Sequence, residues 1–560
     1  MPHAVSMAAP GLQALILCGP GSSFTTFTTN ADENPKALLP IANRPMVWYA
    51  LEFCYRMGVT DINLITPPSA ATALSTALAT NPFLTKLPGP KPDVLAPEAL
   101  DFNTGTAEIL RLPEVKSVIT SDFIVLPCDL VCELRGDRLL QAWMVKSASL
   151  ADLLGEARPG RPHSGGLGVW YETKSEAPIK GQETDFLATV PIPQAKAKAP
   201  TPKDSVLPHV EKVVLSMPTN ALNDVVDEKN GLPIRHSLIR KHPRIRLLTS
   251  HRDAHIYVFP RWVMDFAEHN PRFDSIGEDV LGWWAKATWQ RGLADKLGMG
   301  NICADRGAKD TKSSEPDDSE SPLTGSPGPL PTKASTPNTQ AAVSLCDKKD
   351  AEDPIDAMQP RSSSDTAVPP MLAYIHPAGP APAPLIRRVD NAQLLLATSL
   401  QLAKLPSVEE AGGPEAASPF AHARKVAYPE GVRPRTTITR PDSLLADNVT
   451  VQERAAIRES VVGAHCHVGE GARLTQCLLM DGAVVGRNCR LTRCVLGRRC
   501  EIGEGCVLAE CEVQENLLVE PRTEAKNEKL MSSSGLEATE EEMQEALEQE
   551  GMEHEEAVLD

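Results

Sequence analysis

The sequence predicts an α/β domain of the Rossmann-like type, followed by a parallel β-helix. Short apolar runs alternate with helical patterns in the first half of the chain, and an aliphatic residue recurs every five or six residues in the C-terminal third. The first pattern is typical of a mainly parallel sheet covered by helices, which binds ligands beyond the carboxyl ends of its strands. The second pattern is typical of a solenoid whose coils stack on one another.

The first predicted unit is a strand, a helix and a second strand. The apolar run 12–17 predicts a buried strand, and the run 62–66 predicts its neighbour. Between them, the segment 45–58 begins with proline and ends with glycine, which is the pattern of a helix. This order of elements indicates a βαβ unit.

A further strand is predicted at 123–129, and Asp129 closes it. Because the carboxyl ends of parallel strands meet at one edge of a sheet, we expect Asp129 to lie near the turn at Gly19 that follows the first strand. The chain is expected to return to this domain through a strand at 371–376 and a helix at 390–404.

The composition indicates folded modules joined by proline-rich segments. The 560 residues include 49 prolines, and only 4% are aromatic. A formal net charge of -17 argues against a nucleic acid as the main ligand. Lys36 is the first basic residue, and no apolar stretch approaches the roughly 18 residues that a membrane span needs. We therefore expect a cytosolic protein without a membrane contact.

Changes in composition divide the chain into modules. Residues 304–370 contain no aromatic side chain and are expected to be disordered. The segment 537–560 holds eleven acidic residues and no Lys or Arg, so we expect a solvated tail, with docking to a basic partner as the alternative. The predicted modules are an α/β domain at 11–303, a disordered insertion at 304–370, the return of the α/β domain at 371–405, a linker at 406–432, a hexapeptide-repeat β-helix at 433–520 and an acidic tail at 521–560.

The aliphatic positions of the predicted β-helix form columns that repeat every 17 residues. A turn column at Gly471, Asn488 and Gly505 has residue types that tolerate a positive φ. Such a repeat predicts coils of three short strands around an aliphatic interior. The aliphatic positions are Leu445, Val451, Ile457, Val462, Val468, Leu474, Leu479, Val485, Leu491, Leu496, Ile502, Leu508 and Val513.

Most of the thirteen cysteines follow the same repeat. Adjacent coils lie ~4.8 Å apart, so disulfides or a ladder of metal ligands would be within reach. We favour reduced thiols that fill small positions in the core, because free cysteine is among the most buried residue types and the cytosol keeps it reduced. The cysteines concerned are Cys466, Cys477, Cys489, Cys494, Cys500, Cys506 and Cys511.

The first predicted strand ends in a glycine-bearing turn with the sequence Gly-Pro-Gly-Ser-Ser at 19–23, and Lys36 follows in a Pro-Lys-Ala-Leu-Leu-Pro frame. Backbone N–H groups of such a turn can approach a phosphate, and a lysine supplies positive charge. Together with a Gly-Thr turn at Gly105 and Thr106, Asp129 and the hexapeptide repeat, this pattern resembles the sugar-1-phosphate nucleotidyltransferase superfamily.

The resemblance implies a nucleotidyltransferase-type α/β domain followed by a left-handed β-helix. In that superfamily the loop and a lysine hold a triphosphate, and an aspartate after a strand binds Mg²⁺. Lys36 matches the lysine and Asp129 the aspartate, whereas Ser23 replaces the arginine of the family and no second metal aspartate is identified. Loss of one such charged group commonly costs roughly 10²-fold in rate, so we predict no catalytic residue, no metal and no cofactor. The predicted degenerate pocket, which at most retains vestigial nucleotide binding, consists of Gly19, Gly21, Ser22, Lys36, Gly105, Thr106 and Asp129.

Within that superfamily, the chain resembles the gamma subunits of eukaryotic translation initiation factor two B, in a fungal form. The resemblance covers 15–28, 35–49, 275–281, 388–391 and the β-helix. It implies a non-catalytic subunit that pairs with the epsilon subunit, which carries the exchange activity, and joins alpha, beta and delta subunits in a decamer. That complex exchanges GDP for GTP on its substrate, translation initiation factor two. No aromatic residue follows Tyr428, which argues against the epsilon paralogue.

Two alternative functions remain open. Lys36, Asp129 and the turn at Gly105 would also suit an active sugar-1-phosphate nucleotidyltransferase, or a sensor that binds a nucleotide or a sugar nucleotide. Asp129 also has an alternative structural role, because an aspartate after a parallel strand can cap a neighbouring helix.

Overall fold

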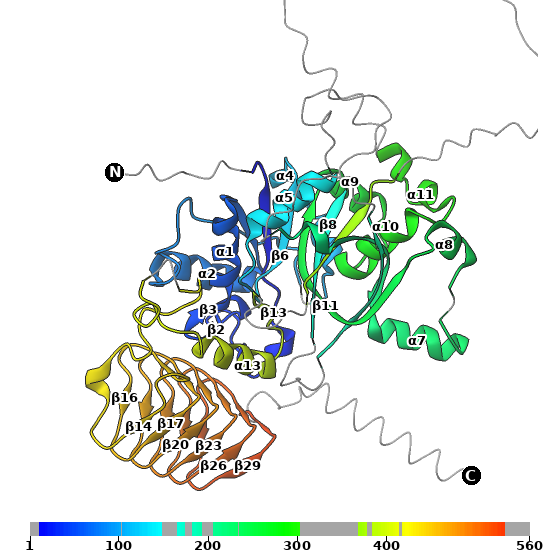
Figure 1. Cartoon of the computed structure of the whole chain (residues 1–560). Coiled ribbons are helices and arrows are strands. Elements are labelled where there is room, and N and C mark those ends of the chain that lie inside the picture. Colours follow the sequence, from blue (N-terminus) through cyan, green and yellow to red (C-terminus); the bar gives the residue numbers. More distant parts are fainter. Residues whose placement is uncertain are drawn as a thin grey trace, which may run out of the picture.

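A computed structural model describes residues 10–101, 103–147, 165–173, 182–192, 205–232, 234–302, 368–377, 384–413 and 417–532. An α/β domain built around one large sheet lies against a β-helix (Figure 1). The predicted insertion up to residue 367 and the acidic segment 537–560 lie outside the described residues. Within the described ranges, no helix combines the length and the apolar character that crossing a membrane requires.

The central sheet has nine strands in the order β5-β4-β1-β6-β11-β8-β12-β10-β9. Strands β5, β4, β1 and β6 are parallel, as are β8 and β12, whereas the other neighbours are antiparallel. The expectation of a mainly parallel sheet is therefore correct for one half only. Consecutive strands such as β9 and β10 pair antiparallel, which needs no helical crossover. The bounds are β1 (Gln13–Leu17), β4 (Asp61–Ile65), β5 (Asp93–Leu95), β6 (Phe123–Pro127), β8 (Gly166–Glu172), β9 (Asp185–Pro191), β10 (Val210–Pro218), β11 (Arg246–Phe259) and β12 (Met371–Ile375).

The helices predicted at 45–58 and 390–404 are both present. Helix α1 ends at Gly58, which has a φ of 86°, and α13 begins at Asn391, whose side chain accepts a hydrogen bond from the backbone N–H of Leu394. The helices are α1 (Met46–Met57), α2 (Pro68–Thr80), α3 (Thr106–Ile109), α4 (Pro113–Val118), α5 (Gly136–Ser147), α7 (Thr219–Lys229), α8 (His236–Lys241), α9 (Trp262–His269), α10 (Leu281–Ala287), α11 (Leu293–Lys296) and α13 (Ala392–Ala403).

Several short elements complete the α/β domain and the start of the β-helix. Two small antiparallel pairs are formed by β2 with β3 and by β7 with β13. Their bounds, with those of the short helical turns, are β2 (Pro40–Ile41), β3 (Arg44–Pro45), β7 (Leu130–Cys132), β13 (Ile386–Arg388), η1 (Ser22–Phe24), η2 (Lys36–Leu38), η3 (Leu207–His209), η4 (Ile276–Val280) and η5 (Pro429–Gly431).

The C-terminal region consists of three stacked parallel sheets, which confirms the predicted parallel β-helix. The sheets have the orders β14-β17-β20-β23-β26-β29, β15-β18-β21-β24-β27-β30 and β16-β19-β22-β25-β28. The bounds are β14 (Thr437–Ile438), β15 (Leu444–Leu445), β16 (Thr450–Val451), β17 (Ala456–Arg458), β18 (Val461–Val462), β19 (His467–Val468), β20 (Arg473–Thr475), β21 (Leu478–Leu479), β22 (Val484–Val485), β23 (Arg490–Thr492), β24 (Val495–Leu496), β25 (Glu501–Ile502), β26 (Val507–Ala509), β27 (Glu512–Val513), β28 (Leu518–Val519), β29 (Glu524–Lys526) and β30 (Lys529–Leu530).

The register of the β-helix follows the predicted columns. Val462 pairs with Leu479, which pairs with Leu496, and all positions of the aliphatic column are at most 3% exposed. The predicted turn column has φ values of 71°, 57° and 74°. The strands continue to Leu530, ten residues beyond the predicted end of the β-helix at 520. The last coils contain more polar residues, so the aliphatic repeat does not reveal them in the sequence.

Every cysteine in the described part of the chain is buried and free. The Cys489 thiol, for example, donates to the carbonyl oxygen of Gly503 at 3.0 Å. This confirms reduced core thiols for these residues, while Cys303 and Cys346 lie outside the described ranges.

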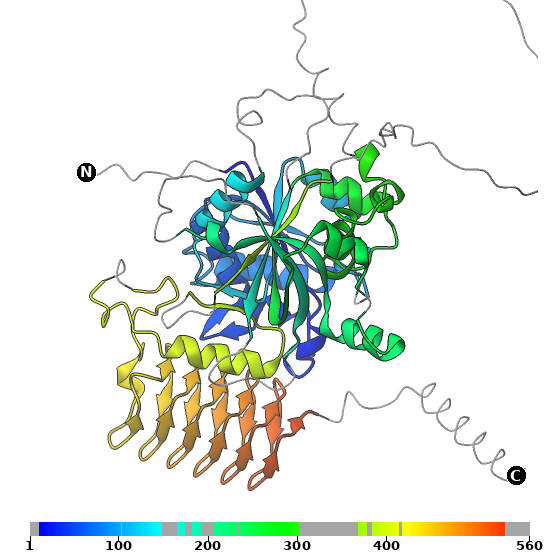
Figure 2. The same cartoon turned by 45° about the vertical axis from the view of Figure 1, so that its right-hand side comes forward.

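The two modules meet in a hydrophobic interface, although the interior of the β-helix forms a cluster of its own. Helix α13 lies along the β-helix (Figure 2), and Val461, Leu478 and Val495 of the facing sheet are buried in the core of the α/β domain. The predicted linker at 406–432 also packs: the Arg44 guanidinium donates to the carbonyl oxygens of Phe420 and Ala421 at 3.0 and 2.8 Å. The prediction of a linker is therefore wrong for residues 417–432, because this segment packs against the α/β domain.

Candidate functional site

The structure brings together the two charged residues of the predicted pocket. Lys36 begins η2, and Asp129 lies between β6 and β7. The Lys36 Nζ atom is 2.7 Å from Asp129 Oδ2, and the side chains are 14% and 2% exposed. The pair is therefore nearly closed off from solvent. Asp129 contacts the side-chain ammonium of Lys36 and not a backbone N–H of η2, so the helix-capping alternative does not describe this contact.

Arg388 is a third member of the site, and sequence reasoning assigned it no role. Strand β13 pairs with β7 so that Arg388 lies opposite Leu130, and the backbone N–H of Val389 donates to the Asp129 carbonyl oxygen at 2.9 Å. This register places Arg388 Nε 3.7 Å from Asp129 Oδ1. The stretch 388–391 was one of the resembling segments, but only the pairing of β13 with β7 reveals that it reaches Asp129.

The two cations decide the charge of Asp129. Burial alone would raise the pKa of this carboxyl group, but Lys36 and Arg388 outweigh burial and hold the pKa below its usual value. Burial alone would likewise lower the pKa of Lys36, yet attraction to Asp129 raises it. Asp129 is thus a buried carboxylate whose charge is already compensated by protein side chains.

A second polar group surrounds Arg388. Arg388 NH2 is 3.7 Å from Asp390 Oδ2, and Asp390 is also bound by Arg252. Arg388 NH1 lies 3.0 Å from His255 Nε2. Because a guanidinium can only donate, this nitrogen accepts and the imidazole is neutral. Burial and the positive charge of Arg388 hold the pKa of His255 well below its usual value.

Asp253 belongs to the same polar group, because it accepts a hydrogen bond from the backbone of His255. It accepts from the Tyr257 hydroxyl at 2.5 Å and from the backbone N–H of His255 at 2.8 Å. Burial and the nearby carboxylate of Asp185 raise the pKa of Asp253 to about 7. His255 has a φ of 52°, which is uncommon for a non-glycine residue. Strained backbone and buried titratable groups therefore lie together here.

The residues present do not fit the magnesium ion that the resemblance implies. Mg²⁺ requires a near-octahedral shell of oxygen ligands, but both carboxylate oxygens of Asp129 face cations. Asp390, the further carboxylate beside Arg388, is itself held by Arg252 and Arg388. Among the described residues, no cluster of three or more His, Cys, Asp or Glu side chains could hold a metal ion.

The glycine-bearing turn has only part of its predicted geometry. Gly21 has a φ of 85°, and a Cβ atom there would lie 3.1 Å from Lys36 Cβ, so glycine is needed at this position. Ser22 and Ser23 are exposed at the start of η1. Gly19 is also exposed, and an added Cβ would meet nothing within 4 Å. A role of Gly19 and Ser22 in phosphate binding stays a prediction.

Gly105 and Thr106 contact a different segment from Lys36 and Asp129. A Cβ atom on Gly105 would lie 2.1 Å from Asp274 Oδ1, and the Thr106 hydroxyl accepts from the Ile276 backbone N–H at 2.9 Å. These two residues hold the turn that enters η4. That turn continues to Gly277, where an added Cβ would be 3.2 Å from the Tyr257 hydroxyl, so the two halves of the predicted pocket are connected through the polar group around Asp253.

The segment that follows the glycine-bearing turn binds the β-helix. The Thr26 hydroxyl donates to Glu512 at 3.2 Å. The backbone N–H of Asn30 and the side-chain amide of Asn34 donate to the two carboxylate oxygens of Glu515 at 3.2 and 2.9 Å. Glu515 is only 6% exposed. The loop between β1 and Lys36 is therefore used for contact between the modules, which the sequence alone did not suggest.

Two comparisons with known proteins agree with this architecture. Residues 429–527 match a family model described as the EIF2B subunit epsilon LbH domain, a left-handed β-helix. Over 281 residues the chain is 27% identical to translation initiation factor eIF2B subunit gamma from Schizosaccharomyces pombe, an alignment that covers 50% of this chain and 52% of that protein. The chain thus spans about half the length of this relative. Both similarities are to subunits of the translation initiation factor eIF2B.

Proposed function

We propose that this chain acts as a non-catalytic gamma-type subunit of eIF2B, which pairs with the epsilon subunit to promote exchange of GDP for GTP on translation initiation factor two. The similarity to eIF2B subunits supports the assignment to this complex. The observation that carries the non-catalytic role is the compensation of Asp129 by Lys36 and Arg388.

Nucleotidyl transfer would require Lys36 to leave Asp129 and to bind the phosphate groups of a nucleotide. Phosphoryl chemistry depends on metal ions and cations aimed at the phosphate oxygens. Here Lys36 is bound to Asp129, and Ser23 stands where the resembling superfamily has an arginine. A metal ion at Asp129 would have to displace Lys36 from a nearly buried ion pair. The same residues are well suited to stabilise the domain.

The proposed setting follows from the subunit role. The partners would be the epsilon subunit and the alpha, beta and delta subunits in a decamer, with translation initiation factor two as substrate. The complex would work in the cytosol, without a cofactor in this chain and without direct contact to nucleic acid or membrane.

The direct test is reconstitution of the complex from full-length subunits. The chain should co-purify with epsilon, and its addition should accelerate GDP release from translation initiation factor two. Deleting the β-helix is unsuitable here, because it would expose the apolar side chains of the α/β domain that Val461, Leu478 and Val495 now cover. A chain that neither binds epsilon nor changes the rate of GDP release would refute the proposed function.

The two alternative functions have their own readouts. Release of pyrophosphate from a nucleoside triphosphate and a sugar phosphate, abolished by Asp129→Ala, would establish a nucleotidyltransferase. Calorimetry with GTP and GDP-sugars would detect a nucleotide sensor. We expect no pyrophosphate and no heat of binding.

A further inference from the structure

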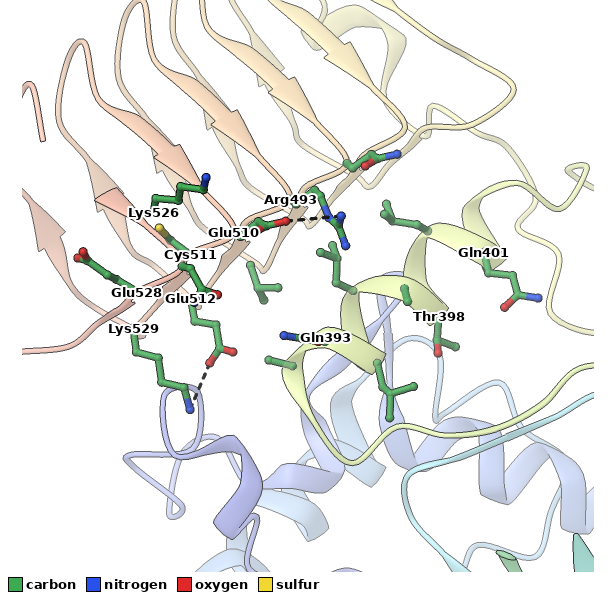
Figure 3. A pocket seen from close by; sticks show the side chains of 18 of the residues that line it. Gln393, Thr398, Gln401, Arg493, Glu510, Cys511, Glu512, Lys526, Glu528 and Lys529 are labelled. Carbon is green, nitrogen blue, oxygen red and sulfur yellow. Dashed lines mark ion pairs between the residues drawn. The ribbon is translucent and has the colours of Figure 1, made fainter. Parts of the chain in front are cut away.

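A groove lies between α13 and the adjoining edge of the β-helix. Its volume is about 1420 Å³. Gln393 and Gln401 lie on the helix wall, and Arg493, Lys526 and Lys529 lie on the β-helix wall (Figure 3). The groove is far along the chain from Lys36 and Asp129, and the proposed function assigns it no role.

One corner column of the β-helix lines the groove. Gln476, Arg493, Glu510 and Asn527 follow one another there, and all have φ values between 55° and 57°. The column therefore places four polar side chains beside α13.

The groove is positively charged on an acidic chain. Five basic and three acidic side chains line it, a net charge of +2 on a chain whose net charge is -17. The basic side chains are Arg387, Lys404, Arg493, Lys526 and Lys529, and the acidic ones are Glu510, Glu512 and Glu528.

The ion pairs along the β-helix wall of the groove are weak enough to exchange. Arg493 is 3.5 Å from Glu510, and Lys529 is 3.8 Å from Glu512 (dashed lines in Figure 3). Exposed pairs of this kind contribute only about 0–1 kcal/mol each. Lys526 has no ion pair with a described residue. An acidic ligand could therefore bind these cations at little cost.

The chain itself supplies such a ligand close by. Its described part ends at Ser532, whose backbone N–H donates to Gln514 Oε1 at 2.7 Å. Ser532 follows β30, the strand that carries Lys529. The segment 537–560 begins a few residues further on and holds eleven acidic residues without any Lys or Arg. A short tether gives such a segment an effective concentration in the millimolar range.

We propose that the acidic segment 537–560 binds in cis to the groove between α13 and the β-helix. Its carboxylates pair with Lys526, Lys529 and Arg493, and an acidic segment of another protein has to displace it to reach these residues. This inference does not depend on the proposed function.

A photo-crosslinking experiment on the full-length chain tests this contact. A photoreactive amino acid is placed at the position of Leu547, and crosslinked peptides are identified by mass spectrometry. We expect crosslinks to the groove residues within 393–404 and 493–529. The double substitution Lys526→Gln and Lys529→Gln should reduce them several-fold, while Lys296→Gln on exposed α11 should not. Crosslinks that lie elsewhere, or that persist undiminished in the double variant, overturn the proposal.

A second measurement leaves the described residues unchanged. Glu540→Gln, Glu541→Gln, Glu542→Gln and Glu545→Gln, introduced together, remove four acidic charges from the segment 537–560. These changes, or a rise in salt from about 50 to about 500 mM, should reduce the same crosslinks because exposed charges are screened. Groove crosslinks that are insensitive to both would show that the contact is not electrostatic, and they would contradict the proposal.

Discussion

Asp129 lies in a buried group of charges that joins three distant segments of the chain. Its carboxylate is 2% exposed and lies between Lys36, which comes from the loop after β1, and Arg388, which comes from β13. The attraction of Lys36 and Arg388 to Asp129 offsets part of the free-energy cost of burying these three charges. The sequence identified Lys36 and Asp129, but it could not identify Arg388, because a residue 259 positions away reaches Asp129 only through the pairing of β7 with β13.

Gly105 and Gly19 allow a matched test of how closely the chain packs around the predicted pocket. Gly105→Ala should lower the free energy of unfolding by roughly 1–3 kcal/mol, because the new Cβ atom would lie 2.1 Å from Asp274 Oδ1. Gly19→Ala should have little effect on stability, since nothing lies within 4 Å of its added Cβ. Chemical denaturation measures both. Equal stabilities of the two variants would argue against the close approach at Gly105.

Asp253 makes the stability of the chain depend on pH. Its pKa is about 7 in the folded state and 3.8 for the free carboxyl group, so between these values the folded state keeps a proton that the unfolded state has released. The free energy of unfolding should therefore fall as the pH rises from about 4 to about 7. Asp253→Asn should make this decline shallower, whereas the control Asp93→Asn, at an exposed carboxylate, should not. Denaturation midpoints across this range provide the measurement, and an unchanged slope in Asp253→Asn would exclude this source.

At the scale of elements, α13 connects the polar group to the β-helix. The strand β13 ends at Arg388, Asp390 follows, and Asn391 caps the helix that lies along the β-helix. Two charged residues of the site, Arg388 and Asp390, and the contact between modules are thus carried by one continuous segment. The sequence predicted the helix, because its cap and its apolar residues are local signals. The position of the helix depends on residues in both modules.

Removal of the α13 cap should weaken this segment. Asn391→Ala leaves the backbone N–H of Leu394 without its acceptor, and we expect a loss of about 1 kcal/mol in the free energy of unfolding. Asn391→Asp retains an acceptor and serves as the control. Hydrogen exchange of the first turn of α13 reports the local effect; exchange as slow in Asn391→Ala as in the parent chain would mean that tertiary contacts alone hold the helix.

At the scale of the whole molecule, the hydrophobic interface between the modules predicts that they unfold together. Leu478 is fully buried between α13 and the β-helix core. Leu478→Ala should cost about 2–5 kcal/mol and shift a single calorimetric transition to lower temperature. Leu518→Ala, at a side chain that is 68% exposed, should leave the transition nearly unchanged. Two separate transitions in the parent chain would contradict this coupling between the modules.

The sequence by itself determined the features that depend on local order. Periodicity fixed the buried column of the β-helix, glycine and asparagine marked its turns, and the motifs located Lys36 and Asp129. Only the tertiary structure decided that half of the sheet is antiparallel and that Arg388 lies beside Asp129. It also decided that the loop after β1 binds Glu515 and that a groove lies beside α13. The physical reason is the distance along the chain: side-chain patterns report which face of an element is buried, but hydrogen bonds such as that from Asn34 to Glu515, 481 residues apart, exist only once the modules have packed.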